Sequence, residues 1–208
     1  LGIEVEDFFN GKLNAEKKNV VVIGGGDTAM DCVRTAIRQG AKSVTCLYRR
    51  DLANMPGSQR EVANAEEEGV KFDWLASPLA VLEKKGGGAK GVKSIRMKLG
   101  LADASGRQAP EEIVGSDFEV KADMVIKALG FDPEDLPVHF SEPGLTVNRW
   151  GGVKVDYRTM ATSLDGVFAA GDIVRGASLV VWAIKEGRDA AAAIEQYLRA
   201  KVMRAAAE

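Results

Sequence analysis

Residues 20–30 read "VVVIGGGDTAM", and the predicted fold follows from this segment. Its valine-rich first part has the length and β-branching of a strand that is buried on both faces, as in a parallel sheet. Three glycines follow at once, and apolar residues then recur at helical spacing up to Gln39, ahead of Gly40, a residue type that commonly ends helices. This order of strand, glycine turn and helix predicts the start of a nucleotide-binding α/β fold.

The glycine turn fits the pattern GxGxxA, with Gly24, Gly25 and Gly26 in the turn and Ala29 at its last position. The first glycine permits a tight turn, and the absence of a side chain at Gly26 lets a pyrophosphate approach the backbone. The phosphate would then lie on the unpaired amides at the positive end of the helix. The alternative is a turn with a purely structural role.

Two polar residues, Asp27 and Thr28, stand at the expected start of the helix. Their side-chain oxygens can cap the unpaired amides there. Because a carboxylate is a poor neighbour for a phosphate, we expect Asp27 to point away or to bind a ribose or an amide group.

The next expected strand decides which nucleotide is bound, because it ends in "CLYRRD", residues 46–51. A site for NAD places an acidic side chain at this point to receive the ribose 2′-hydroxyl, whereas a site for NADP places an arginine there. Arg49 and Arg50 therefore favour NADPH over NADH, since guanidinium groups offer paired donors to a phosphate. They also argue against a methyltransferase, and Arg60 is a weaker candidate for the same phosphate. Two alternatives are a solvated strand end and Asp51 as a displaced ribose acceptor.

The following segments repeat the pattern. We predict a helix over residues 58–69 and a third strand over 70–76, which completes one βαβαβ half of a doubly wound fold. Beyond Pro78 the sequence predicts a β-hairpin over 79–99, a polar loop over 102–110 and an apolar strand over 122–130, with a domain boundary near residue 121. Further on, it predicts a hairpin over 144–156, a strand over 166–172 and a helix over 179–203.

Composition excludes several classes of protein. The 28 basic and 30 acidic side chains give a net charge of -2, so we expect no binding to nucleic acid or to an anionic membrane. The apolar runs are too short to span a membrane and no secretory pattern opens the chain, which predicts a cytoplasmic protein. Cys32 and Cys46 are too far apart for a metal or redox motif, so we expect two buried thiols and no metal site. His139 lies in a loop, and no side chain has the setting of a catalytic acid, base or nucleophile.

Four segments together resemble the small (beta) subunit family of bacterial NADPH-dependent glutamate synthases, within the wider group of flavoproteins similar to pyridine-nucleotide-disulfide oxidoreductases. They are "GGGDTAMDC", "YRRDLANMPGSQREVANAEEEGV", "VIKALGFDPE" and "GVFAAGDIVRGASLVVWAIKEGRDAA". The resemblance implies a Rossmann-like NADPH-binding domain at 19–121, inserted in a split FAD-binding domain whose carboxyl-terminal part is 122–203. It also implies a longer parent protein, in which the FAD pyrophosphate loop and the cysteines for iron–sulfur clusters lie upstream.

The same resemblance assigns roles to residues of the carboxyl-terminal part. Asp172 would hydrogen-bond the ribityl or pyrophosphate region of the flavin, and Gly171 would allow its close approach. The helix that begins near Leu179 and Val180 would direct its positive end at the isoalloxazine O2 and stabilise the reduced flavin. A further stretch, "ALG", with Ala128 and Gly130, resembles the family's second crossing between the two domains, close to both nucleotides.

The implied function is hydride transfer from NADPH to FAD, followed by electron transfer through iron–sulfur clusters to the large (alpha) subunit, which makes glutamate. One alternative is a nucleotide-binding fragment without activity of its own. Another is the NADPH and FAD arm of a different iron–sulfur flavoprotein, such as a ferredoxin-dependent or pyrimidine-reducing oxidoreductase. An FAD half-domain alone would leave a sheet edge and an apolar face uncovered, which predicts self-association.

Overall fold

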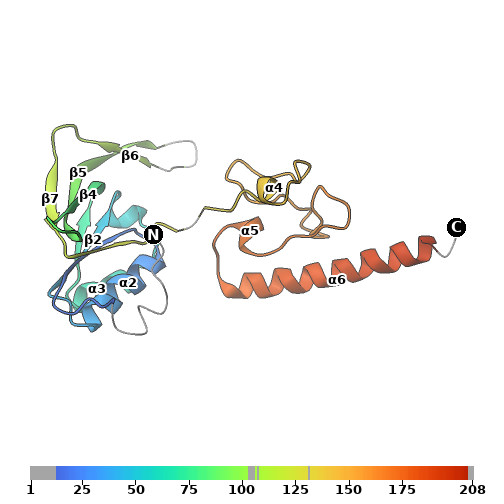
Figure 1. The fold of residues 1–208 in the computed structure, drawn as a ribbon, viewed down its shortest axis with the longest axis horizontal. Helices are drawn as coiled ribbons and strands as arrows, with labels where there is room; N and C mark the ends of the chain where they lie inside the picture. The colour runs from blue at the N-terminus through green and yellow to red at the C-terminus, as the bar shows by residue number, and fades with distance from the viewer. Residues whose placement is uncertain (1–12, 103–105, 107, 131, 206–208) are drawn as a thin grey trace. The chain divides into compact units, whose positions relative to one another are not determined.

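The computed structural model describes residues 13–102, 106, 108–130 and 132–205, and it forms two compact units that divide between Leu129 and Gly130 (Figure 1). The amino-terminal residues 1–12 and residues 103–105 and 107 of the expected polar loop lie outside the described residues. The boundary expected after residue 121 differs from this division. Strand β8 (Met124–Lys127) pairs in parallel with β1 (Asn19–Ile23), which makes it part of the first unit.

The first unit is built on a four-stranded parallel sheet in the order β3-β2-β1-β8. Strand β1 lies in the interior of this sheet, as the valine-rich run predicted, and Val20 aligns with Val44 on one side and with Met124 on the other. The carboxyl ends of parallel strands meet at one edge of a sheet, where nucleotides bind in folds of this kind. The other two strands are β2 (Ser43–Tyr48) and β3 (Lys71–Trp74).

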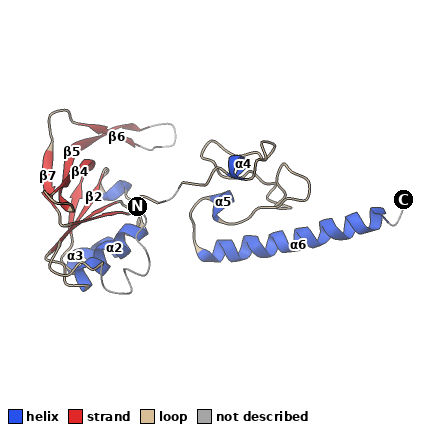
Figure 2. Cartoon of the chain, in the orientation of Figure 1, coloured by secondary structure: helices blue, strands red, loops and turns tan. Residues whose placement is uncertain are grey.

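Both faces of the parallel sheet are covered. Val20 and Val22 of β1 pack in one cluster with side chains of α2 (Asp27–Arg38) and α3 (Gln59–Glu67). Val21 and Ile23 point to the other face, where they contact residues of the antiparallel strands. This double burial explains why the sequence of β1 is continuously apolar instead of alternating. Figure 2 shows the two helices and the antiparallel strands on opposite sides of the sheet.

The antiparallel layer confirms the predicted hairpin. Its central strand, β5 (Ala89–Ala102), pairs with three others, and the glycines at 86–88 turn the chain between the first two strands. The change from the parallel to the antiparallel sheet occurs at Leu75, whose φ of 53° bends the chain between β3 and β4. The partners of β5 are β4 (Ala76–Glu83), β6 (Gln108–Glu112) and β7 (Phe118–Lys121).

The described residues of the second unit form three helices and little regular strand. These are α4 (Leu136–His139), α5 (Asp172–Arg175) and α6 (Val180–Ala205), of which α6 confirms the predicted helix. The hairpin expected over 144–156 is reduced to one bridge, Val147 to Val153, and the strand expected over 166–172 to the bridge between Ala161 and Phe168. Those two predictions were too regular, because a strand needs a neighbour along its length and these segments pair at single residues.

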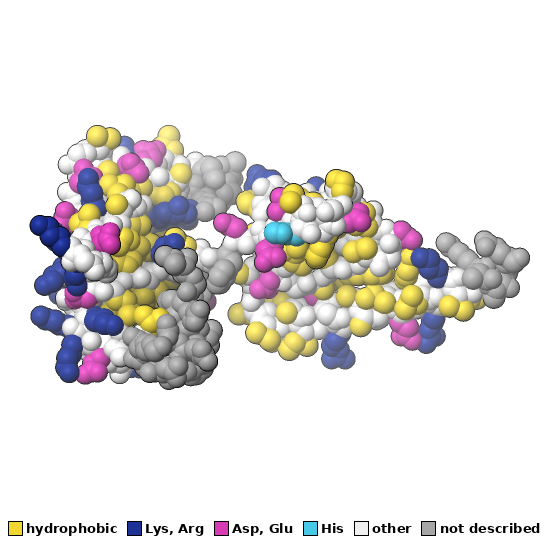
Figure 3. Space-filling view, viewed as in Figure 1, with side chains coloured by type: hydrophobic (Ala, Val, Ile, Leu, Met, Phe, Trp, Pro, Cys, Tyr) yellow, Lys and Arg dark blue, Asp and Glu magenta, His cyan; other side chains and the backbone are white. Residues whose placement is uncertain are grey.

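Helix α6 carries many exposed apolar side chains, and Figure 3 shows hydrophobic side chains gathered along it. Trp182 is 41 % exposed and Met203 is 74 % exposed. Within the described part of the chain, no helix has both the length and the apolar content that a membrane span requires. The other large apolar side chains exposed on or next to α6 are Leu179, Val180, Val181, Ile184, Leu198 and Val202.

Candidate functional site

The first two glycines of the turn are required by packing. Gly24 has a φ of +151°, and a Cβ atom there would lie 2.2 Å from the carbonyl oxygen of Ala128. A Cβ on Gly25 would lie 2.3 Å from the ring of Tyr48. The amide of Gly24 also donates to the carbonyl of Leu47 at 3.2 Å. The turn is therefore held between β2 and Ala128, the residue that follows β8.

Gly26 differs from its neighbours because space is open around it. It is the N-cap of α2 with extended backbone, and no atom lies within 4 Å of the position of a Cβ. Its carbonyl accepts from the amides of Ala29 at 2.9 Å and Met30 at 3.3 Å, so the amides before Ala29 precede the first intrahelical bonds. Such amides at a helix start bind phosphate groups well. Thr28 is exposed at this end of the helix.

A buried thiol supports the turn from below. Cys46 donates its S–H to the carbonyl of Gly24 at 3.3 Å. Burial, with a smaller contribution from Cys32, raises the pKa of Cys46 to about 12, so the thiol stays protonated and keeps its donor. Burial and the charge of Asp31 also raise the pKa of Cys32. Both cysteines are free thiols, and Cys46 has a structural role.

A second chain segment, Met55–Ser58, lies on the glycine turn. It belongs to one of the four segments that carry the family resemblance, but its contact with the turn was not predicted. The amide of Gly57 donates to the carbonyl of Gly25 at 3.0 Å. The amide of Ser58 donates to the Asp27 carboxylate at 3.0 Å. Because α3 begins immediately after Ser58, these bonds tie its start to the start of α2. The only signal in the sequence was the Pro-Gly pair in "NMPGS", which indicates a turn but not its partner.

The arginines predicted from the end of β2 follow that strand directly. Arg49 is exposed, whereas Arg50 is half-buried, and its buried Nε atom has no hydrogen-bond partner among the described residues. Such a buried donor is costly to leave unpaired. Arg60 is exposed in the first turn of α3. Asp51 accepts from the amide of Asn54 at 2.9 Å and caps the 3-10 helix at Leu52–Asn54, so this oxygen is already engaged.

Ion pairs join α3 to α2. Arg34 pairs with Glu61 and donates to Glu68 at 2.8 Å, and Arg38 donates to the same Glu68 oxygen at 2.7 Å. Hydrogen bonds from Arg34 and Arg38 lower the pKa of Glu68 from its usual 4.5 to about 2. The network fixes the position of α3 and, through it, of the Met55–Ser58 segment.

In the second unit, a buried carboxylate holds the turn before α5. Gly171 has a φ of 79°, and its amide donates to Glu186 of α6 at 2.9 Å. Arg175 donates its Nε to Glu186 at 2.6 Å, and its guanidinium lies 4.6 Å from the ring of Trp182. Burial alone would raise the pKa of Glu186, but the bonds from Arg175 and Gly171 outweigh it, and the net pKa is lowered. Sequence reasoning missed Glu186, because a lone glutamate in a helix reads as a surface charge.

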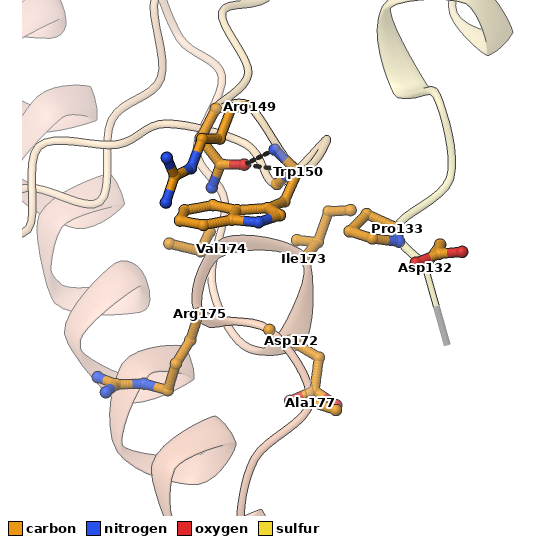
Figure 4. Close-up of a pocket in the computed structure, with 12 residues that line it drawn as sticks. Asp132, Pro133, Arg149, Trp150, Asp172, Ile173, Val174, Arg175 and Ala177 are labelled. Carbon is orange, nitrogen blue, oxygen red and sulfur yellow. Dashed lines mark hydrogen bonds between the residues drawn. The ribbon is translucent and has the colours of Figure 1, made fainter. Parts of the chain in front are cut away.

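A pocket of about 750 Å³ lies beside this turn (Figure 4). Trp150 is central to it, with the Arg149 guanidinium 3.9 Å from its ring. Asn148 fixes the loop by accepting from the amide of Trp150 at 2.8 Å. Asp172 lines the pocket, while Figure 4 shows Arg175 directed away from the Trp150 ring.

The remaining predicted residues are spread over the second unit. Gly130 is exposed with a φ of 84°. Leu179 and Val180 are exposed at the start of α6 and do not line the pocket. His139 is exposed at the end of α4. Among the described residues, no group of three or more His, Cys, Asp or Glu side chains is arranged to hold a metal ion.

The chain was compared with known proteins. The family model for pyridine nucleotide-disulphide oxidoreductase matches residues 3–187. The chain is 66% identical over 201 residues to the glutamate synthase [NADPH] small chain of Azospirillum brasilense, covering 97% of this chain and 41% of that protein. It is 64% identical over 197 residues to the putative glutamate synthase [NADPH] small chain of Cereibacter sphaeroides, covering 95% of this chain and 46% of the relative. It thus spans less than half the length of these curated relatives.

The solved structure of thioredoxin reductase from T. acidophilum is similar in fold, with a TM-score of 0.71 and 22% sequence identity. The similarity covers 93% of this chain and 56% of that one. This similarity in fold agrees with the α/β fold expected from the sequence. It extends over the parallel sheet, the antiparallel layer and the segment that follows them.

Proposed function

We propose, from the premise that the chain belongs to the pyridine nucleotide-disulphide oxidoreductase family, that its first unit binds NADPH for an NADPH-dependent oxidoreductase reaction. The observation that carries this proposal is the difference between the glycines of the turn. At Gly24 and Gly25 neighbouring atoms occupy the space that a Cβ would need, whereas the Cβ position of Gly26 is open at the start of α2. That is where a pyrophosphate would approach the backbone.

Different residues of the first unit would hold the pyrophosphate and the adenosine 2′-phosphate of the coenzyme. The amides at the start of α2, next to Gly26 and Thr28, would hold the pyrophosphate. Arg49 and Arg50 would hold the adenosine 2′-phosphate, with Arg60 as a further cation. The exposure of Arg49 and the half-buried position of Arg50 directly after β2 support this assignment, because guanidinium groups offer paired donors to a phosphate. A site for NADH would need an acceptor instead, and the Asp51 carboxylate accepts from Asn54 and caps the 3-10 helix.

For the second unit we propose a share in an FAD site. Asp172 would accept a hydrogen bond from a ribityl hydroxyl, and the exposed position of Asp172 on the pocket supports this. The amino end of α6, at Leu179 and Val180, would lie near the electron-rich edge of the ring system. FAD, when bound, would supply the redox chemistry by accepting a hydride from NADPH. Ala128, which packs against Gly24, and Gly130, two residues further along the chain, are proposed as further contacts with the nucleotides.

The protein's own contribution to the reaction is then positioning. The chain would bind the nicotinamide coenzyme in a fixed orientation, and no side chain is assigned as an acid, base or nucleophile. The similarity to glutamate synthase small chains extends the proposal to electron transfer, through iron–sulfur clusters outside this stretch, to a large subunit that forms glutamate. A cytoplasmic location is part of the same proposal.

The exposed apolar surface of α6 favours a second candidate. In this candidate function, the first unit binds the dinucleotide, but the chain has no redox activity until another protein surface covers the exposed apolar side chains of α6 in the second unit. Under this candidate function, the chain would self-associate through the same helix. Alternatively, the chain would form the NADPH- and FAD-binding part of a different iron–sulfur flavoprotein.

The nucleotide assignment is tested by the double variant Arg49→Ala/Arg50→Ala. We expect its dissociation constant for NADPH to rise by roughly tenfold or more, because charge-assisted bonds to the 2′-phosphate are lost. Binding of NADH should change by less than about twofold, because NADH lacks that phosphate. Isothermal titration calorimetry with both coenzymes measures the two constants.

A matched control removes the same charge elsewhere. Lys42 and Lys71 are exposed. Lys42 precedes β2 and Lys71 begins β3, so both lie at the amino ends of these parallel strands, whereas the arginines follow the carboxyl end of β2. The variant Lys42→Ala/Lys71→Ala should leave both affinities unchanged. Equal losses for NADPH and NADH in the arginine variant would rule out the role in phosphate binding.

A further inference from the structure

We infer that Asp27 is a positioning residue for the dinucleotide site: its carboxylate holds the Met55–Ser58 segment on the glycine turn, while its charge opposes the pyrophosphate that this turn binds. The inference rests on the proposed function, and it adds a second wall and an electrostatic setting to that site. Two effects of one carboxylate are involved, and they act in opposite directions on affinity.

The first effect is geometric. The Asp27 carboxylate accepts from the amide of Ser58 at 3.0 Å, and this bond joins the first residue of α2 to the N-cap of α3. The neighbouring amide of Gly57 donates to Gly25 at 3.0 Å. Contact is close, because a Cβ on Gly57 would lie 3.1 Å from the carbonyl oxygen of Gly25. Met55 anchors the other end of the segment in the core.

These contacts bear on the ligand because they involve the turn itself. The segment bonds to Gly25 and Asp27, the residues on either side of Gly26, at which the pyrophosphate would approach. A loosened segment would leave the backbone of the turn less well fixed. Preorganisation of a binding loop raises affinity by reducing the ordering cost on binding.

The second effect is electrostatic. Asp27 is the acidic residue in the first turn of α2, where its negative charge interacts favourably with the helix dipole. A pyrophosphate at Gly26 would use the same positive end and would be repelled by the carboxylate. Asp27 is exposed, so water and salt screen this repulsion to a modest size.

An asparagine separates the two effects. Asp27→Asn keeps a side-chain oxygen that accepts from the amide of Ser58, but it removes the charge. Asp27→Ala removes both. Asp31 provides a matched control, because it is exposed on the same helix one turn further from the glycine turn, and Asp31→Asn changes the net charge equally.

The hydrogen bond is also removable from its other end. Ser58→Pro deletes the amide donor while the charge of Asp27 remains, and the φ of Ser58, -61°, is one that proline adopts. If Asp27→Ala fails to fold, Ser58→Pro still reports on the bond. Its folded state is checked by circular dichroism and by the exchange rate of the Gly57 amide, which should rise.

The experiment measures NADPH affinity of the whole chain by calorimetry at low and at high salt. For Asp27→Asn we expect the dissociation constant at low salt to fall by about threefold or more, and this gain to disappear at high salt. Asp31→Asn should stay within about twofold of the unsubstituted chain, because its charge lies a turn away. Asp27→Ala and Ser58→Pro should both bind at least about threefold more weakly than Asp27→Asn.

The outcomes separate this inference from the proposed function. If the unsubstituted chain does not bind NADPH, the proposed function fails, whatever the variants do. If it binds NADPH but Asp27→Asn loses as much affinity as Asp27→Ala, the carboxylate is a direct ligand and the positioning role is overturned. A gain in Asp27→Asn that persists at high salt would overturn the electrostatic part.

Discussion

The two units of the chain differ in how completely they cover their apolar residues. In the first unit the central strand is enclosed on both faces, and Val21 and Val22 are 0% exposed. In the second unit the longest helix leaves Val180 73% and Val202 69% exposed. All the residues proposed to bind the dinucleotide therefore belong to a unit whose apolar core is buried. The residues proposed to contact the flavin lie in a unit that leaves large apolar side chains exposed to solvent.

The comparison also separates two kinds of glycine-dependent site. The turn at Gly24 to Gly26 is held by β2, β8 and the Met55–Ser58 segment, all within the first unit. The turn at Gly171 is held chiefly by the buried carboxylate of Glu186, which α6 provides. We therefore expect some substitutions in the first unit to change mainly its stability and others to change mainly its affinity for NADPH. Substitutions at the Gly171 turn should act mainly on the stability of the second unit.

The largest expected effect is at the glycine turn. Gly24→Ala places a Cβ against the backbone of Ala128 at a φ that alanine rarely adopts, so the free energy of unfolding should fall by about 3 kcal/mol or more. Gly26→Ala meets no atom within 4 Å and should cost about 1 kcal/mol or less, yet its methyl group would obstruct the pyrophosphate and weaken NADPH binding by roughly tenfold. Urea unfolding and calorimetry measure the two effects.

The pair of variants has a definite failure. If Gly26→Ala binds NADPH as well as the unsubstituted chain, the pyrophosphate does not approach at Gly26. If Gly24→Ala is as stable as Gly26→Ala, the close packing of the turn against Ala128 has no energetic weight.

The next effect concerns the second unit. Glu186→Ala leaves Arg175 and the Gly171 amide without their buried acceptor and should lower the stability of this unit by about 2 to 4 kcal/mol, the lower end being expected because Arg175 is partly solvated. Glu186→Gln keeps a neutral acceptor and should lose less. In a Trp74→Phe background, fluorescence comes from Trp150 and Trp182 and reports on this unit alone. An unchanged urea midpoint in Glu186→Ala would show that the cluster does not hold the turn.

The smallest effect is the pH dependence of the first unit. Because the folded-state pKa of Glu68 is lowered from 4.5 to about 2, its stabilising interactions are fully present above pH 4.5 and are lost as the pH falls towards 2. Hydrogen bonds from Asn19 and Lys84 also lower the pKa of Asp123, which acts in the same direction. The urea midpoint should therefore fall over this range, and Arg34→Gln/Arg38→Gln should flatten the slope. An equal slope in that variant would remove Glu68 as the cause.

Much of the first unit was predictable because its signals are local. The run before Gly24 showed a doubly buried strand, and the arginines after Tyr48 followed the strand end as expected. The bond from Ser58 to Asp27 was not predictable, since it joins residues 31 positions apart through the backbone of a loop. The same holds for Glu186, whose burial depends on the turn at Gly171 and not on its neighbours in the sequence.

The errors in the second unit have the same physical origin. The segment over 166–172 is apolar and short like a strand, but strand formation depends on a neighbour, and in the described residues it makes one bridge. The compact units divide between Leu129 and Gly130 and not near residue 121 for a related reason. The parallel pairing of β8 with β1 is a long-range contact that no local pattern reveals.

The central claim, that the first unit holds the dinucleotide, is tested most directly by hydrogen–deuterium exchange of the whole chain with and without NADPH. We expect slower exchange in residues 24–30 and 49–60, with residues 171–180 unchanged. Slower exchange confined to 171–180, or none at 24–30 under conditions where NADPH is bound, would contradict it.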